Sequence, residues 1–232
     1  MKKIGIIGAM ELEVEELKAK MQVNRIVEKA GMKFFEGVLS NTDVVIVQSG
    51  IGKVNAGICV QILVDTFEIT TVINTGVAGS LNNKANIGDI IISSESQEHD
   101  MDVTALGYEP GIIPQMKESV FKADAKIAEL AVEVCKEVNP DINVLTGKVV
   151  SGDQFISSKE QKEKLINVFH GDCAEMEGAA IAHAAYLNNI PYLVIRAISD
   201  KADGSAQMDY PTFEKAAAAH SAKLVEHLVA RM

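Results

Sequence analysis

The amino-acid sequence predicts an α/β protein with a mostly parallel or mixed sheet, folded as one domain over residues 1–232. Short runs rich in β-branched residues alternate with helical patterns along the whole chain, which is typical of this class. No linker, internal repeat or low-complexity tract divides the chain. With 47% apolar residues over 232 positions, it can bury a substantial core without disulfides or metal.

In the first half of the chain, the apolar run "KIGIIGA" predicts a strand, and residues 10–21 repeat apolar side chains at helical spacing. "FFEGVLS" and "DVVIVQSG" are separated only by Asn41 and Thr42, which predicts a hairpin. A helix over 53–67 and a buried strand over 71–79, ending in a glycine-rich turn, are expected to follow.

The second half continues this alternation, with one exception. Residues 97–117 show no periodicity and hold two prolines, and such long irregular segments in compact domains are usually functional or disordered. The elements expected around this segment are strands over 88–95, 144–153 and 191–200 and helices near 124–138, 159–168, 177–189 and 211–230.

Charge and composition argue against several classes of function. The net charge is −10 and no basic tract is visible, so we expect no nucleic-acid partner. The three cysteines, far apart in the sequence, fit buried roles in a reducing compartment rather than a disulfide framework or a metal site. The sequence shows no signal peptide and no apolar run of membrane-spanning length, so we expect a cytoplasmic protein without a membrane partner, metal or cofactor.

Four turns that follow strands are where a ligand site is expected, since ligands of open α/β sheets bind beyond the carboxyl ends of strands. These turns read "GAMELE", "NTGVAGS", "SGDQFIS" and "RAISDKAD". Neither "IGIIGAM" nor "SGIGKVNAG" has the glycine spacing of a dinucleotide or P-loop motif. Their glycines therefore serve tight turns or the close approach of a small ligand.

Each acidic residue near these turns has two interpretations. Glu13 lies in a first helical turn, where the helix dipole favours any acid, and Glu11 and Glu15 are equal to it in this respect. Asp200, at the end of an apolar run, is either a solvated cap or a functional acid. Arg196, inside that run, requires a carboxylate partner that the local sequence does not identify.

Taken together, the turns resemble one family. "GIIGAMELEVE", "SGIGKVNAG", "NTGVAGS", "DVTALGY", "VVSGDQFI", "AEMEGAAIAHAA" and "RAISDKAD" resemble, in this order, the bacterial 5′-methylthioadenosine/S-adenosylhomocysteine nucleosidases. The resemblance runs from residue 3 to about residue 215. It implies the nucleoside phosphorylase fold, a single three-layer α/β/α domain on a mixed, mostly parallel sheet, usually as a homodimer. It also implies hydrolysis of the N-ribosyl bond of both thionucleosides, and of 5′-deoxyadenosine, to adenine and the 5′-substituted ribose.

The resemblance further implies roles for individual residues. Asp200, supported by Ser199, would protonate N7 of the leaving adenine, and Glu13 would orient and deprotonate the attacking water with help from Arg196. Glu177 would bind the ribose hydroxyls. The other implied substrate-binding positions are Met10, Ile51, Ala78, Gly79, Phe155, Ile156, Glu175, Met176 and Tyr210, with Val103, Leu106 and Pro114 contributed from segment 97–117 of the neighbouring subunit.

The sequence departs from the family at Val77, Leu106 and Tyr210, where Ser, Phe and Phe are frequent, and these positions bear on the preferred 5′ group. A purine nucleoside phosphorylase is one alternative, but phosphate requires cationic anchors and arginine is scarce near the turns. A related futalosine-type nucleosidase is a second alternative. A nucleoside-binding protein without activity is a third, although binding alone does not require both an acid and a base.

Overall fold

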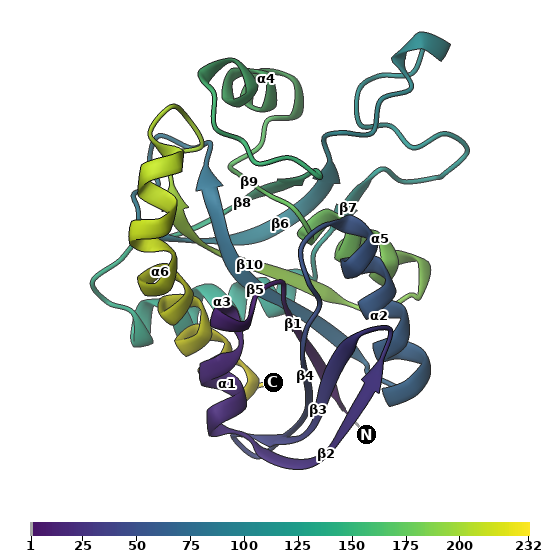
Figure 1. The fold of residues 1–232 in the computed structure, drawn as a ribbon, viewed down its shortest axis with the longest axis vertical. Helices are drawn as coiled ribbons and strands as arrows, with labels where there is room; N and C mark the ends of the chain where they lie inside the picture. Colours follow the sequence, from purple (N-terminus) through teal and green to yellow (C-terminus); the bar gives the residue numbers. More distant parts are fainter. Residues whose placement is uncertain (1) are drawn as a thin grey trace.

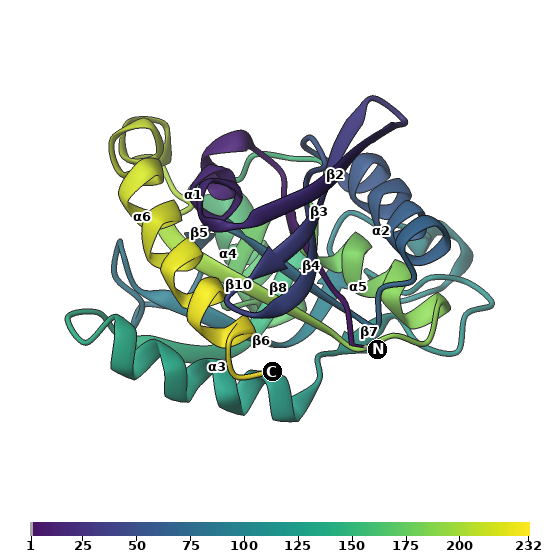
Figure 2. The same cartoon turned by 90° about the horizontal axis from the view of Figure 1, so that it is seen from below.

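The structure, a computed structural model, describes residues 2–232. In this part of the chain all ten strands belong to one sheet, and helices pack on both of its faces (Figure 1, Figure 2). None of the helices in residues 2–232 combines the length and the apolar composition that crossing a membrane requires. The α/β class predicted from the alternating pattern is confirmed.

Four parallel strands form the centre of the sheet and position the site. They are β1 (Ile4–Gly8), β4 (Thr42–Gln48), β5 (Thr71–Ser80) and β10 (Tyr192–Asp200), in the order β4-β1-β5-β10. They are rich in Val and Ile and are mostly buried on both sides, as expected for parallel strands covered by helices. Because they run in one direction, the turns that follow them meet at one edge of the sheet.

A closed ring of strands completes this edge. β10 pairs with both β5 and β6 (Ile90–Glu98), and the ring continues through β8 (Val144–Ser151) and β9 (Cys173–Glu175) back to β5. Among the strand pairs of residues 2–232, five are parallel and five antiparallel, so the sheet is mixed. The ring brings the end of β9 next to the end of β5.

Helices form two layers with separate apolar cores. On one face, α2 (Lys53–Phe67) and α5 (Gly178–Leu187) pack against the sheet, and on the other α1 (Glu15–Lys20), α3 (Ala125–Val138) and α6 (Ala206–Val229) do so (Figure 2). α4 (Lys159–Phe169) covers a smaller apolar cluster. This is the three-layer α/β/α arrangement implied by the resemblance.

Several elements differ from the sequence-based expectation. The edge strand β2 (Gln22–Lys29), which pairs with β3 (Met32–Leu39), was not predicted, because its residues are almost all exposed and show no apolar alternation. The short strand β7 (Val120–Lys122) was also missed. The helix expected over 10–21 is divided into η1 (Glu11–Glu13) and α1. α6 begins before Pro211, which lies inside the helix rather than at its start.

Candidate active site

A cavity of about 270 Å³ lies where the carboxyl ends of β1, β5, β9 and β10 meet. Its exposed lining is mostly apolar, and Ala9, Val77 and Ala174, which were not predicted as site residues, form part of it. Twelve residues predicted as site residues also line the cavity: Met10, Glu13, Ile51, Ala78, Gly79, Phe155, Glu175, Met176, Glu177, Ser199, Asp200 and Tyr210.

Glu13 is the last residue of the short 3₁₀ turn η1 and is buried, whereas the neighbouring acids Glu11 and Glu15 are exposed. Its Oε2 accepts hydrogen bonds from the backbone N–H groups of Ala9 (2.7 Å) and Met10 (3.0 Å), and its Oε1 accepts one from Val77 (3.1 Å). Burial raises the pKa of Glu13, and the nearby Arg196 charge and these amides partly oppose that rise. The carboxylate is therefore fixed in direction and more basic than an exposed one.

Two glycines of β5 make room for the carboxylates. A Cβ atom at Gly76 would lie 2.5 Å from Glu13 Oε1, and one at Gly79 would lie 2.8 Å from Asp200 Oδ1. Three strand residues span about 10 Å, so the two acids contact β5 at well-separated points. Gly79 was predicted as a site residue, whereas Gly76 was not.

Asp200 ends β10 and is buried. Its Oδ2 accepts a hydrogen bond from the Ser199 hydroxyl (2.9 Å) and its Oδ1 accepts one from the backbone N–H of Ala202 (2.8 Å). Burial outweighs these bonds and raises the pKa of Asp200 above its usual range. The expectation that Ser199 supports Asp200 matches this geometry.

Glu175 and Glu177 lie on either side of the junction between β9 and α5. Glu177 Oε1 accepts a hydrogen bond from the backbone N–H of Gly52 (2.8 Å). Burial, together with the charge of Glu175, raises the pKa of Glu177 to about 8. Glu175 Oε2 accepts from the backbone N–H groups of Glu177 (3.1 Å) and Gly178 (2.8 Å), which fixes the start of α5.

Arg196, whose partner the sequence left open, pairs with Glu175. Its Nε and Nη2 both donate to Glu175 Oε2, and Nη2 also donates to Asn74 Oδ1. Ser151 donates to the other Glu175 oxygen. Although burial alone raises the pKa of Glu175, the Arg196 charge and these hydrogen bonds hold it below its usual value. Nothing in the local sequence singled out Asn74 or Ser151, because both act from other strands.

The apolar end of the cavity is built around aromatic and thioether groups. The Phe155 and Tyr210 rings meet edge to face with centroids 5.8 Å apart, and the Tyr210 hydroxyl donates to Met10 Sδ at 3.3 Å. Phe155 is 47% exposed, so its ring is free to take a flat ligand on one side. Such rings stack well on planar bases.

Five of the predicted site residues do not line the cavity. Arg196 lies behind the carboxylates, and the Ile156 side chain packs in the apolar cluster next to α4. Val103, Leu106 and Pro114 belong to the irregular segment between β6 and β7, where Leu106 is 77% exposed. Within one chain this segment does not cover the cavity.

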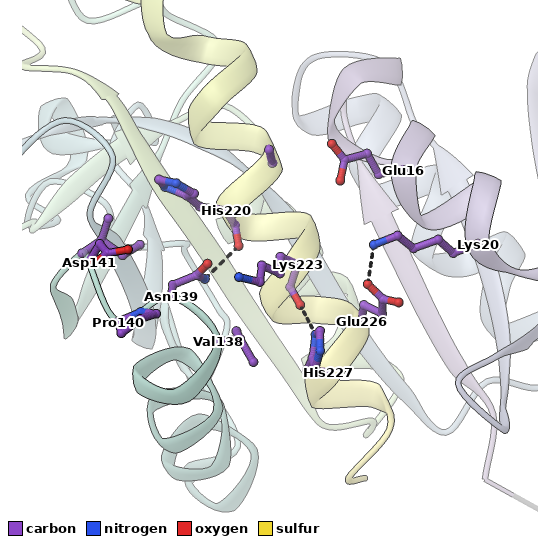
Figure 3. Close-up of a pocket in the computed structure, with 12 residues that line it drawn as sticks. Glu16, Lys20, Val138, Asn139, Pro140, Asp141, His220, Lys223, Glu226 and His227 are labelled. Atoms are coloured by element: carbon purple, nitrogen blue, oxygen red, sulfur yellow. Dashed lines mark hydrogen bonds and ion pairs between the residues drawn. The ribbon is translucent and has the colours of Figure 1, made fainter.

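A second cavity, of about 370 Å³, lies away from the strand ends, between α1, the end of α3 and the C-terminal half of α6 (Figure 3). In it Lys20 pairs with Glu226, and Asn139 donates to the backbone carbonyl of His220 (Figure 3). The first cavity, at the strand ends, is the better candidate for chemistry, because four carboxyl groups converge there, those of Glu13, Glu175, Glu177 and Asp200. No lysine, arginine or histidine of residues 2–232 lines that first cavity.

Comparison with known proteins identifies the family of the chain. A family model described as "Phosphorylase superfamily" matches residues 3–230. The 5′-methylthioadenosine/S-adenosylhomocysteine nucleosidase of Staphylococcus aureus (strain JH9) is 44% identical over 230 residues, which cover 99% of this chain and 100% of that protein.

Two solved structures are similar over nearly their full length. The same kind of nucleosidase from Neisseria meningitidis, in complex with methylthio-immucillin-A, superposes with a TM-score of 0.95 at 37% identity and covers 100% of both chains. A futalosine hydrolase of Helicobacter pylori gives a TM-score of 0.94 at 33% identity, covering 100% of this chain and 98% of that one. The chain therefore belongs to the phosphorylase superfamily and, within it, to the family of 5′-methylthioadenosine/S-adenosylhomocysteine nucleosidases.

Proposed function

We propose that this protein hydrolyses the N-ribosyl bond of 5′-methylthioadenosine and S-adenosylhomocysteine, and of 5′-deoxyadenosine, releasing adenine and the 5′-substituted ribose. The relatives named above support the substrate class. The observation that supports hydrolysis as the reaction is the set of side chains that line the cavity. Four carboxyl groups line it, and no cationic side chain of residues 2–232 is there to hold phosphate.

Asp200 is the general acid in this proposal. Burial raises its pKa and so favours the protonated form, which can give its proton to N7 of adenine as negative charge develops on the leaving base. The Ser199 hydroxyl and the Ala202 amide keep the carboxyl group in place for this transfer. A neutral leaving group departs more readily than an anionic one.

Glu13 is the base on the water side. Three backbone amides fix both of its oxygens, so a water held by it has a defined direction toward the sugar. Its raised pKa also makes it a stronger acceptor for the proton of that water. The Arg196 charge opposes the rise and so favours the ionised form that a base requires.

Glu177 is proposed to bind the ribose hydroxyls, with Met176 packed against the sugar. Phe155 would stack on adenine, while the Ile156 backbone would bond the polar edge of the base. Met10, Ile51 and Tyr210 would surround the 5′ group, since all three line the apolar end of the cavity. Discrimination by an apolar pocket is graded, at about 0.8 kcal/mol for each buried methylene.

We further infer that two copies of the chain associate. Apolar side chains are exposed on α2 and α5, among them Val54 (71%), Ile58 (44%) and Leu187 (62%), and this face adjoins the cavity residue Ile51. Leu106 would then reach the neighbouring cavity. Sedimentation tests this inference, and a stable, fully active monomer would refute it.

The experiment for the reaction is adenine release from 5′-methylthioadenosine in phosphate-free buffer, repeated with added phosphate. We expect release at the same rate in both buffers, with free methylthioribose as the second product. Release that requires phosphate would identify a phosphorylase. Release from futalosine alone would identify the related hydrolase, to which the chain is also similar in structure.

A further inference from the structure

A second group of charged side chains lies beside the cavity and has no part in the chemistry described above. Lys53, the first residue of α2, points its ammonium group at two carboxylates. Its Nζ lies 2.6 Å from Asp100 Oδ1 and 3.0 Å from Glu98 Oε2. Glu98 also bonds His183 of α5 through its other oxygen (3.1 Å). We call these four residues the Lys53 cluster.

The cluster is tied to two turns of the cavity. The backbone N–H of Asp153 donates to Asp100 Oδ2 (2.9 Å), and the backbone N–H of Lys53 donates to Asp153 Oδ1 (2.9 Å). Asp153 lies two residues before Phe155, and Lys53 directly follows Gly52, whose N–H binds Glu177. Asp100 is therefore the point at which these turns meet the irregular segment.

That segment depends on its ends for its direction. From residue 102 to residue 109 most side chains are exposed, and the segment projects from the body of the molecule (Figure 1). At its far end, the N–H of Ile113 donates to the Ser119 hydroxyl (2.9 Å). At its near end, the backbone N–H of His99 donates to the Ser151 carbonyl (2.9 Å), and the Asp100 side chain bonds Lys53 and the backbone N–H of Asp153.

The ammonium group balances two carboxylates that would otherwise repel each other. Lys53, Glu98 and Asp100 have side chains that are only 18%, 10% and 15% exposed. Burial alone lowers the pKa of Lys53, but the hydrogen bonds that its ammonium donates to Asp100 and Glu98 raise it above its usual value, so the group stays charged. Removing the ammonium leaves two anions close together in a poorly solvated place. Glu98 lies in β6 and keeps its bond to His183, whereas Asp100 lies in the irregular segment and keeps only its bond to the Asp153 N–H.

We propose that Lys53 is a positioning residue, which fixes the direction of segment 99–117 and thereby the closure of the partner subunit's cavity over the 5′ group. The inference rests on the proposed dimeric nucleosidase and goes beyond it by assigning the residue that holds the closing segment in place. Lys53 itself lies outside the cavity lining and acts through Asp100.

The first test measures the segment directly. Hydrogen exchange of the intact protein is compared for wild type, Lys53→Met and the control Lys20→Met, whose surface pair with Glu226 resembles the Lys53 pairs in length. We expect faster exchange over residues 99–117 in Lys53→Met alone, with Lys53→Arg close to wild type. Unchanged exchange in Lys53→Met would overturn the proposal whatever the substrate proves to be.

The second test asks whose cavity is affected. In Lys53→Met we expect KM for 5′-methylthioadenosine to rise about tenfold, with kcat within about twofold, as when a positioning contact is lost. In mixed dimers of Lys53→Met with Asp200→Asn subunits, the one functional cavity is covered by a segment with native Lys53. Its KM should return to the wild-type value.

A mixed dimer whose KM stays high would place the effect of Lys53 in its own cavity and refute the proposal, as would a fall in kcat at constant KM. If Lys53→Met does not fold, Asp100→Asn takes its place, with a smaller rise in KM expected and the same mixed-dimer rescue. Wild-type protein that fails to release adenine would refute the proposed reaction. The hydrogen-exchange experiment would still test whether Lys53 holds segment 99–117 in place.

Discussion

Glu175, which lines the cavity, forms a buried ion pair with Arg196 behind it, and both the Nε and the Nη2 of the arginine donate to one carboxylate oxygen. The two side chains are 4% and 2% exposed. The same carboxylate oxygen accepts the backbone N–H groups that open α5. This pair therefore fixes the start of α5, where Glu177 lies. The Arg196 charge also acts on Glu13, whose pKa it lowers.

Loss of one member of this pair should destabilise the fold. In Glu175→Gln the guanidinium keeps its burial and loses its main countercharge, so we expect the free energy of unfolding to fall by about 3–5 kcal/mol. The control is Glu226→Gln, which removes a surface pair with Lys20 and should cost about 0–1 kcal/mol. Urea denaturation measures both. Equal costs would show that Arg196 finds compensation elsewhere.

Asp200→Asn should remove the proton that the leaving adenine needs. We expect kcat to fall by about 10²–10⁴-fold, while the affinity for adenine changes only a few-fold, since shape and packing remain. Asp203→Asn, at a nearby acid that does not line the cavity, is the control and should retain activity. Turnover near the wild-type rate in Asp200→Asn would remove Asp200 from the acid role.

Glu13→Gln should impair the activation of the attacking water to a similar degree. An amide cannot take a proton from water, so we expect kcat to fall by about 10²-fold or more. Because the amide NH2 would also face a backbone N–H donor, we expect some loss of stability as well. The matched control is Glu15→Gln, two residues away and exposed. Steady-state assays and thermal unfolding check both variants, and equal activities would contradict the assignment of Glu13 as base.

Gly76→Ala tests the close approach of β5 to Glu13. The added Cβ would meet Glu13 Oε1 at 2.5 Å, so the carboxylate must shift. A shift of about 1 Å in a reacting group can cost about 10²-fold in rate, and we expect a loss of this order. Gly57→Ala is the control, because a Cβ there meets nothing within 4 Å. Full activity in Gly76→Ala would mean that the site accommodates the methyl group.

The raised pKa of Glu177 predicts a pH dependence of stability. The folded protein holds this proton up to about pH 8, whereas an ordinary glutamate releases it near 4.5. The favourable contribution of protonated Glu177 to the free energy of unfolding is therefore complete below pH 4.5 and is lost as the pH rises through about 8. From pH 5 to 8, Glu177→Gln should therefore lose less stability than wild type, by at least about 1 kcal/mol.

Urea denaturation at each pH unit measures this difference, with the exposed Glu28→Gln as the control. The control should follow the wild-type curve. Parallel curves for Glu177→Gln and wild type would contradict a raised pKa at this position.

The order of strands and helices could be predicted from the sequence because their periodicity is a local property. The runs that became β1, β5 and β10 are apolar on both faces, and α2 and α5 follow from long apolar stretches. β2 could not be predicted in this way, since it is an edge strand with almost no buried face and so carries no periodic signal.

The sequence by itself determined which turns follow strands and which acids they carry, and its resemblance to one family named the candidate site. Only the tertiary structure decided the surroundings of each acid. It buries Glu13 on three backbone amides and leaves Glu11 and Glu15 exposed, and it joins Arg196 to Glu175, 21 residues away. The bond between Gly52 and Glu177 spans 125 residues. Such contacts depend on how the ring of strands closes, and no local pattern of residues encodes a distance across the sheet.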